Sequence, residues 1–149
     1  PKVEIVHLDA MQYVEKNSSA FDAIIVDLPD PSNSALSKLY TKSFYALCAR
    51  RLRPGGVLVT QATSPFFAPE AFWCIVKTLD NAVTAATGLD GLVAVPFHVN
   101  VPSFGEWGFA MAARHTIDPK RLPVSVPTRF LNSERLHAMF TFGKDSRPP

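Results

Sequence analysis

The stretch AIIVDLPDPSN at residues 23–33 determines how the rest of this sequence is interpreted. Its apolar start is typical of a strand that a parallel sheet buries on both faces. Asp27 and Asp30 follow directly, and Pro29 and Pro31 restrict the backbone around them. Because ligands of open α/β sheets bind outside the carboxyl ends of the strands, the two carboxylates mark a candidate site.

Alternating strand and helix patterns extend in both directions from this stretch. We predict strands at residues 3–9, 23–27, 57–62, 92–101 and 107–114, and helices at residues 10–22, 35–52 and 68–86. This order predicts an α/β fold with a mostly parallel sheet that ends in an antiparallel pair. The length of 149 residues and the hydrophobic content of 47% fit a single domain over residues 1–149 with a sizeable core.

Composition narrows the classes of partner. The 15 lysines and arginines and the 13 acidic residues leave a net charge of +2, which argues against binding to nucleic acid or to an anionic membrane. No apolar run approaches the ~18 residues of a membrane span, so we expect a soluble, cytoplasmic chain without membrane contact of its own. Cys48 and Cys74 lie in apolar helical patterns without metal-ligand or redox spacing, and we expect both to be reduced core residues.

Four groups of residues follow predicted strands and should therefore meet in one cleft. They are Asp9, residues 27–30, residues 61–67 and residues 100–106. Two of the acids also have a simpler interpretation, since Asp9 can cap the helix that starts at Ala10 and Asp30 can be a turn residue. A rigid pair of carboxylates at a strand end suits a cation, and one of the pair can accept a proton. Residue types and spacing leave both interpretations open.

Five blocks of sequence, taken in order, carry a family resemblance. They are AFDAIIVDLPDPSN (20–33), LYTKSFY (39–45), LRPGGVLVTQATSPFF (52–67), VNVPSFGEWGF (99–109) and TRFLNSERLHAMF (128–140). Together they resemble the aminopropyltransferases, the spermidine and spermine synthase family. The resemblance implies a methyltransferase-like Rossmann fold, usually in a homodimer. It also implies transfer of an aminopropyl group from decarboxylated S-adenosylmethionine, as co-substrate, to a polyamine, with release of methylthioadenosine and without a prosthetic group.

The resemblance assigns roles to residues of the expected cleft. Asp27 is implied to be the catalytic base, because an acceptor amine with a pKa of about 10 is protonated at neutral pH and must lose a proton to attack. The implied acceptor contacts are Asp30, Gln61 and Ser64. The implied donor contacts are Asp9, Ala10, Leu28 and Pro29, with Asp9 and Ala10 beside the adenine. No metal is implied, and the four histidines show no metal-ligand spacing.

Two departures from the family pattern modify these expectations. Val101 stands where the family commonly has the tyrosine of a TYPSG segment, so we expect Glu106 to supply a different amine contact, for an acceptor other than putrescine. The family's glycine-rich loop and N-terminal β domain have no counterpart before residue 3, so we expect the isolated chain to bind the donor weakly. The family sheet order, 3-2-1-4-5-7-6, also leaves the strand at residues 3–9 without its usual neighbours.

Two other functions stay open at this point. One is a different adenosylmethionine-dependent enzyme of the same fold, such as a methyltransferase; the pair of Asp27 and Asp30 argues against it, because a neutral methyl acceptor does not need two carboxylates. The other is a non-catalytic polyamine-binding or nucleoside-binding domain, which the missing glycine-rich loop allows. Bacterial relatives with a stretch similar to residues 61–75 carry membrane helices upstream, so membrane attachment of a longer parent chain also stays open.

Overall fold

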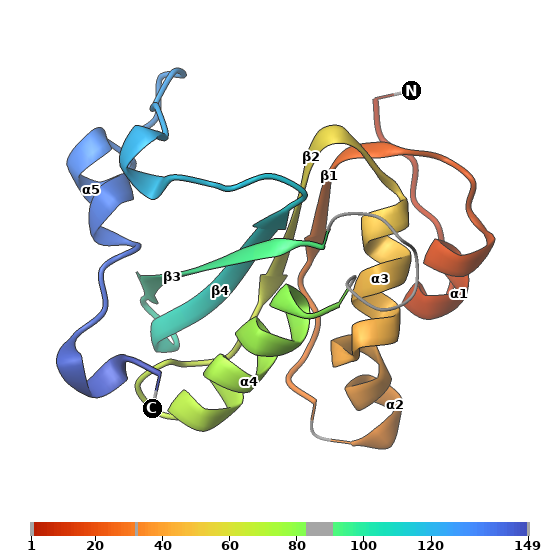
Figure 1. Ribbon diagram of the computed structural model, residues 1–149, viewed down its shortest axis with the longest axis horizontal. Helices are drawn as coiled ribbons and strands as arrows, with labels where there is room; N and C mark the ends of the chain where they lie inside the picture. Colours follow the sequence, from red (N-terminus) through yellow and green to blue (C-terminus); the bar gives the residue numbers. More distant parts are fainter. Residues whose placement is uncertain (1, 32, 83–90, 149) are drawn as a thin grey trace.

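A single mixed sheet organises the computed structural model, which describes residues 2–31, 33–82 and 91–148 (Figure 1). Its strands are β1 (Phe21–Val26), β2 (Leu52–Gln61), β3 (Val93–Val101) and β4 (Gly105–Ala113), in the spatial order β1-β2-β4-β3. β1 and β2 are parallel, whereas β4 is antiparallel to both β2 and β3. Three strands therefore share one direction and β4 opposes them. This confirms the predicted α/β fold with its C-terminal antiparallel pair.

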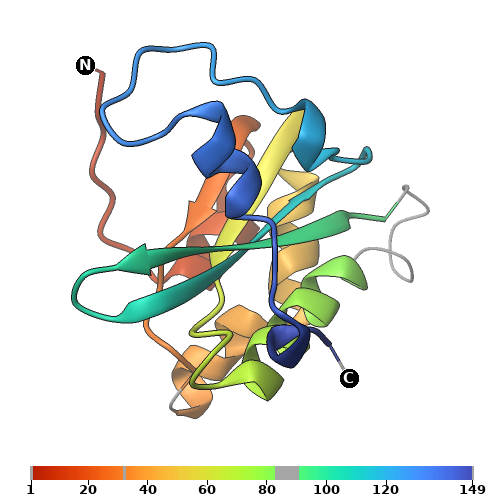
Figure 2. The same cartoon turned by 90° about the vertical axis from the view of Figure 1, so that its left-hand side faces the viewer.

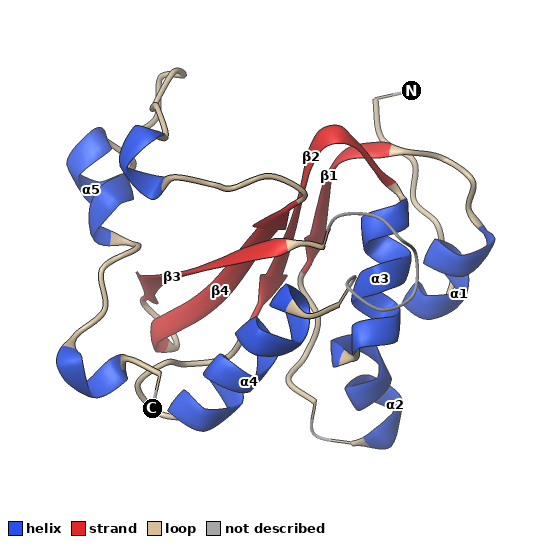
Figure 3. Cartoon of the chain, in the orientation of Figure 1, coloured by secondary structure: helices blue, strands red, loops and turns tan. Residues whose placement is uncertain are grey.

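Helices separate β1 from β2 and β2 from β3, a turn joins β3 to β4, and further short helices precede β1 and follow β4 (Figure 3). The α-helices are α1 (Ala10–Lys16), α2 (Ser34–Ser37), α3 (Lys42–Arg50), α4 (Pro69–Asp80) and α5 (Ser133–Ala138), and the 3-10 helices are η1 (Lys38–Tyr40), η2 (Pro119–Arg121) and η3 (Lys144–Ser146). The helix predicted at residues 35–52 is divided because Thr41 is extended and caps α3, accepting a hydrogen bond of 3.3 Å from the Phe44 amide. None of the helices within the described ranges is long and apolar enough to cross a membrane.

Several predicted ends of elements differ from those in the structure. The helix predicted at residues 10–22 ends at Lys16, before the polar residues that precede β1. β2 starts at Leu52 instead of residue 57, because residues 53–56 form an irregular insertion between the pairings of β1 with Leu52 and with Val57. The helix predicted at residues 68–86 ends at Asp80, and residues 83–86 lie outside the described residues.

The strand predicted at residues 3–9 is absent, so this prediction is wrong. A strand needs a neighbour for its backbone hydrogen bonds, and within the described residues β1 pairs only with β2. The side chains of Val3 and Ile5 are 74% and 77% exposed, and Ile25 of β1 is 76% exposed. The expected burial of β1 on both faces is therefore also wrong, because the face that carries Ile25 is open to solvent.

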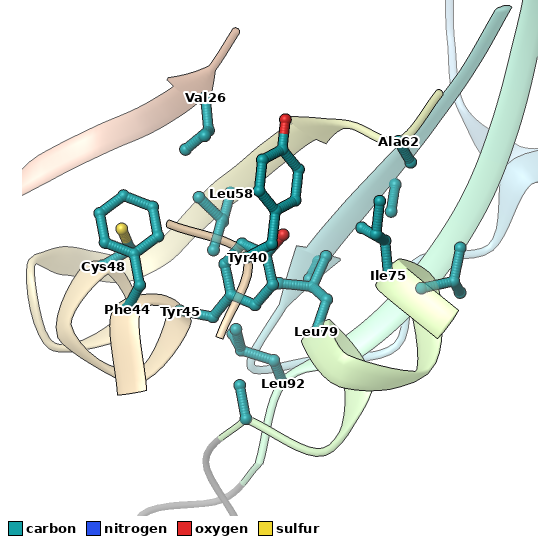
Figure 4. Packing of buried hydrophobic residues seen from close by; sticks show 14 of the residues in the cluster. Val26, Tyr40, Phe44, Tyr45, Cys48, Leu58, Ala62, Ile75, Leu79 and Leu92 are labelled. Carbon is teal, nitrogen blue, oxygen red and sulfur yellow. The ribbon is translucent and has the colours of Figure 1, made fainter. Parts of the chain in front are cut away.

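The core lies between the other face of the sheet and helices α3 and α4 (Figure 4). The buried residues from the helices include Phe44, Tyr45, Cys48, Phe72 and Leu79, and those from the strands include Val26, Leu58, Ala110 and Ala112. Burial raises the pKa of the Cys48 thiol to about 12, so Cys48 is a neutral core residue as expected. The same expectation is wrong for Cys74, which is exposed because it lies on the outer side of α4.

Gly108 joins this core to the carboxyl edge of the sheet. Its amide donates a hydrogen bond of 2.7 Å to the Thr63 carbonyl, and its carbonyl accepts one of 2.9 Å from the Ala62 amide. A Cβ atom at Gly108 would lie 2.4 Å from Cε2 of the buried Phe72 ring and 2.8 Å from the Thr63 carbonyl oxygen. Only a residue without a side chain fits at this crossing.

We therefore expect Gly108→Ala to lower the free energy of unfolding by about 2–4 kcal/mol, because neither Phe72 nor the Thr63 backbone can move freely. Urea denaturation followed by circular dichroism measures this change. Gly143→Ala is the matched control, because its new Cβ would meet only the end of the Asp145 side chain, at 2.7 Å. Equal stabilities of the two variants would contradict the packing described above.

Candidate active site

The buried amide of Gln61, at the end of β2, holds the loop that follows β1. Gln61 is 4% exposed. Its Nε2 lies within hydrogen-bond distance of the Leu28 carbonyl (2.7 Å), the Tyr40 hydroxyl (2.6 Å) and Oδ1 of Asp30 (3.0 Å). The two parallel strands end at the same edge of the sheet (Figure 1), and Gln61 ties their loops together there. The predicted meeting of Asp30 and Gln61 is thus present.

Thr63 holds the second oxygen of Asp30. Its hydroxyl donates a hydrogen bond of 3.2 Å to Oδ2 of Asp30, and its amide donates one of 2.9 Å to Oε1 of Gln61. Thr63 has φ of 59°, in the left-handed region that a β-branched residue rarely occupies. Such a conformation persists only where the surroundings enforce it, and it is frequent at functional sites. Both oxygens of Asp30 are therefore oriented by neutral donors.

Tyr40 supports the same loop from inside the core. Its hydroxyl lies 3.0 Å from the Leu28 carbonyl and 3.1 Å from the Pro29 carbonyl, to which it can donate. Figure 4 shows the ring within the core and the hydroxyl directed toward the side where Val26 and Ala62 lie, at the ends of β1 and β2. Burial raises the pKa of Tyr40, and the charges of Asp30 and Asp27 raise it further, against the hydrogen bond from Gln61.

Asp27 differs from Asp30 in its surroundings. Both residues are exposed, but within the described residues the Asp27 carboxylate takes part in no hydrogen bond or ion pair. Its charge, after that of Asp30, also raises the pKa of the Tyr40 hydroxyl. Asp27 is therefore free to meet a ligand, whereas Asp30 is fixed in place.

Ser64 connects this network to the β3–β4 hairpin. Its hydroxyl donates a hydrogen bond of 2.6 Å to the Glu106 carbonyl and accepts hydrogen bonds from the amides of Phe66 and Phe67, at 3.2 and 3.1 Å. Ser64 is 2% exposed, so its hydroxyl positions the loop and the hairpin. Phe66 and Phe67 are 64% and 73% exposed, so neither belongs to the core.

Glu106, expected to contact an amine, is paired with a histidine instead. Nδ1 of His98 contacts Oε1 of Glu106, and Nε2 of His98 lies 2.8 Å from the Thr141 carbonyl. The two side chains border a cavity of about 280 Å³ that Pro65, Phe66 and other residues also line. Val101, at the position of the family's tyrosine, ends β3 opposite Gly105.

The expected donor contacts lie on the other side of the loop. Ala10 and Leu28 line an open groove of about 420 Å³ together with Val6, Leu8 and residues of β1. Asp9 caps α1, because its Oδ1 accepts a hydrogen bond of 3.1 Å from the Gln12 amide, and its Oδ2 lies 2.9 Å from Nζ of Lys38. The capping interpretation of Asp9 is therefore correct, and an adenine contact would have to share this carboxylate. Pro29 does not line the groove.

The four expected groups form two clusters. Hydrogen bonds link Asp30, Gln61 and Thr63, and the next residue along the chain, Ser64, is bonded to the Glu106 carbonyl. Asp9 is joined to Lys38 of η1. Sequence reasoning did not select Tyr40, because its spacing fitted an apolar helix face, and it gave Thr63 no role of its own. Within the described ranges no group of three or more His, Cys, Asp or Glu residues is arranged to hold a metal ion.

We expect Tyr40→Phe to lower the free energy of unfolding by about 1–2 kcal/mol, because the Pro29 carbonyl loses its donor and Gln61 loses one acceptor. Tyr45→Phe is the matched control. The Tyr45 hydroxyl is buried and finds no hydrogen-bond partner in the part of the chain that the structure describes, so its removal should change stability by less than about 0.5 kcal/mol. Thermal or urea unfolding of both variants measures the difference, and a larger loss in Tyr45→Phe would contradict this assignment.

A second prediction concerns Asp9. The hydrogen bond from Lys38, followed by that from the Gln12 amide, lowers the pKa of the Asp9 carboxyl below its ordinary value. This pair therefore stabilises the fold at neutral pH, and the contribution is lost as the pH falls through the lowered pKa, below about 4. Carboxyl carbon NMR titration should show the Asp9 pKa rising in Lys38→Met and unchanged in Lys16→Met. An unchanged Asp9 pKa in Lys38→Met would show that the ion pair does not persist in solution.

Comparisons with known proteins show what the chain is similar to. Residues 1–119 match the family model of the spermine/spermidine synthase domain. The chain is 46% identical to the polyamine aminopropyltransferase of Oceanobacillus iheyensis, over 97% of the chain and 27% of that relative. It is 44% identical to polyamine aminopropyltransferase 2 of Ralstonia nicotianae, over 100% of the chain and 28% of that relative. The chain thus spans little more than a quarter of the length of these relatives.

A solved structure shows the same fold. The crystal structure of a spermidine synthase in complex with the transition-state analogue AdoDATO superposes with a TM-score of 0.75 at 24% identity, over 96% of this chain and 49% of that one. The sheet with its antiparallel C-terminal pair is thus the methyltransferase-like fold that the resemblance implied. With the match of the family model over most of the chain, this shows that the chain belongs to the spermine/spermidine synthase domain family.

Proposed function

We propose that this chain supplies the acceptor side of a polyamine aminopropyltransferase, which moves an aminopropyl group from decarboxylated S-adenosylmethionine to a polyamine amine. The observation that carries the proposal is the loop after β1, where Asp30 is held by Gln61 and Thr63 while the Asp27 carboxylate has no hydrogen-bond partner among the described residues. The curated relatives named above are polyamine aminopropyltransferases, which supports the reaction type.

The chemistry gives each aspartate a separate task. In the proposed reaction a new bond forms between the amine nitrogen and the carbon next to the sulfonium, the bond from that carbon to sulfur breaks, and methylthioadenosine leaves as a neutral thioether. The attacking nitrogen must lose a proton, and the exposed Asp27 carboxylate is the group proposed to accept it. Asp30 has a fixed orientation and would place the amine for in-line attack.

The acceptor contacts follow from the same geometry. The side-chain NH2 group of Gln61 is hydrogen-bonded to the loop, so the proposed role of Gln61 in a polyamine channel is to position Asp30. Its Oε1 accepts one hydrogen bond, from the Thr63 amide, and has one lone pair left for the ligand. Ser64 likewise positions the neighbouring loop through its bonded hydroxyl. Glu106 is proposed as a second amine contact, at the cavity that it shares with Phe66.

The donor is proposed to bind on the groove side of the loop, where Ala10 and Leu28 lie and where Asp9 and Pro29 are close in sequence. A spermidine synthase with the same fold binds the transition-state analogue AdoDATO, which supports decarboxylated S-adenosylmethionine as the co-substrate. We propose no prosthetic group. A homodimer and a cytoplasmic location stay predictions from the resemblance.

We expect Asp27→Asn to reduce methylthioadenosine release by about 10²-fold or more, because the amide cannot accept the proton of the attacking amine. The assay uses the longest natural chain that contains this sequence, decarboxylated S-adenosylmethionine and a panel of polyamines. Asp22→Asn is the control, since Asp22 lies at the opposite end of β1 and pairs with Arg53 in solvent. Release that requires no polyamine, or that survives in Asp27→Asn, would contradict the proposed function.

A further inference from the structure

His98 faces Glu106 across the β3–β4 hairpin. In the register of the hairpin His98 lies opposite Gly108 and Asn100 lies opposite Glu106, so His98 and Glu106 are diagonal neighbours on one face. The side chains are 20% and 37% exposed, and Nδ1 of His98 contacts Oε1 of Glu106. The partner of Glu106 is therefore built into the sheet.

The same histidine holds the C-terminal strap, by which we mean residues 139–146. Its backbone amide donates to the Met139 carbonyl at 2.9 Å, and its Nε2 lies 2.8 Å from the Thr141 carbonyl. Its ring packs on Phe142 with centroids 4.7 Å apart. The strap runs across the hairpin toward α4 (Figure 2), where Nε1 of Trp73 donates to the Ser146 carbonyl at 3.0 Å. The position of His98 is thus fixed from two sides.

The contacts of the His98 ring show in which protonation state both of its nitrogens can form hydrogen bonds. Each ring nitrogen faces an acceptor, a carboxylate oxygen at Nδ1 and a carbonyl oxygen at Nε2. A neutral imidazole carries only one N–H, so both contacts are hydrogen bonds only when His98 is an imidazolium. In that state the positive charge of His98 compensates the negative charge of Glu106.

Glu106 lies at a position where its charge matters for a ligand. It lines both the 280 Å³ cavity beside Pro65 and Phe66 and a cavity of about 170 Å³ beside Arg135. Ser64 joins its backbone to the loop that holds Asp30. The charged groups that line the two cavities beside His98, among the described residues, are Glu106 and Arg135. Among the described residues, no hydrogen bond is made to Oε2 of Glu106, because His98 contacts Oε1.

We propose that His98 is a positioning residue that sets how strongly Glu106 attracts the amine of the acceptor. This inference rests on the proposed function. As an imidazolium, His98 orients Glu106 and neutralises it; after losing its proton, His98 leaves the carboxylate charge uncompensated. Amine binding therefore becomes tighter when a rise in pH removes the proton from His98. Arg135 does not change its charge in this step and so adds no pH dependence.

The test is an NMR titration of the 149-residue chain with putrescine and with spermidine at several pH values between about 5.5 and 8. Both amines stay fully protonated over this range, so the protein is the source of any change. We expect the dissociation constant read from the Glu106 and His98 resonances to fall about threefold to tenfold from the lowest to the highest pH. A constant that does not change with pH, or the absence of any shift at these resonances, would overturn the inference.

Two variants separate the charge effect from a structural one. His98→Gln keeps a polar side chain but does not titrate, and we expect its amine affinity to be independent of pH. Glu106→Gln should weaken amine binding and also abolish the pH dependence. His137→Gln, at an exposed histidine of α5, should keep the wild-type dependence. A wild-type pH dependence in His98→Gln would overturn the inference.

A measurement without mutation covers the case in which His98→Gln does not fold. Calorimetric titration of the unmodified chain in two buffers of different ionisation enthalpy counts the protons released when the amine binds. We expect net proton release at a pH at which His98 of the free chain is protonated, and no release at any pH of the series would contradict the inference. A different result would contradict the proposed function. If the resonances of Asp27 and Asp30 do not respond to either amine, the proposed acceptor site is wrong, independently of the result for His98.

Discussion

The side-chain amide of Gln61 is the interaction on which the candidate site depends. Its Nε2 has two hydrogens and three acceptors in reach, and these belong to the loop after β1 and to η1. An amide left buried without partners costs ~1–3 kcal/mol, so the loop cannot leave the end of β2 without a substantial penalty. The parallel pairing of β1 and β2 brings their carboxyl ends together. The amide then fixes the orientation of Asp30 within that edge.

The acids of the chain are distinguished by how their charge is balanced. Asp9 is paired with Lys38, and Glu106 with His98. Asp30 receives hydrogen bonds from an amide and a hydroxyl, which orient it without adding positive charge. Asp27 has no such partner among the described residues. Two neighbouring negative charges that no protein cation offsets favour a cationic ligand, which is the property that an amine acceptor requires.

The sequence predicted that Asp30 and Gln61 lie together at the edge of the sheet, but not the contacts that hold them there. The rule that ligands bind at the carboxyl ends of strands selected Asp27, Asp30 and Gln61, because it depends only on the order of the strands. Tyr40 was missed because it stands at a position of the apolar pattern, and the pattern does not show that its hydroxyl reaches out of the core to the loop after β1. His98 depends on Thr141, 43 residues away, and no local pattern shows such a contact.

The errors have a related cause. The residues at 3–9 have the composition of a strand, but composition expresses a preference, and a strand forms only where another strand offers its hydrogen bonds. Cys74 was expected in the core because its neighbours are apolar. Which side of α4 faces the sheet is decided by Phe72, Ile75 and Leu79, and Cys74 lies on the other side.

The two ends of the proposed acceptor site differ in a way that matters for catalysis. At the reacting end the Asp30 carboxylate is held by neutral donors, and Asp27 has no hydrogen-bond partner among the described residues. At the far end Glu106 is coupled to His98 and, through it, to the C-terminal strap. An interaction that is equally strong in the bound substrate and in the transition state changes binding and leaves the barrier unchanged. A change at His98 should therefore alter the affinity for the amine, while the chemistry at Asp27 proceeds at its own rate.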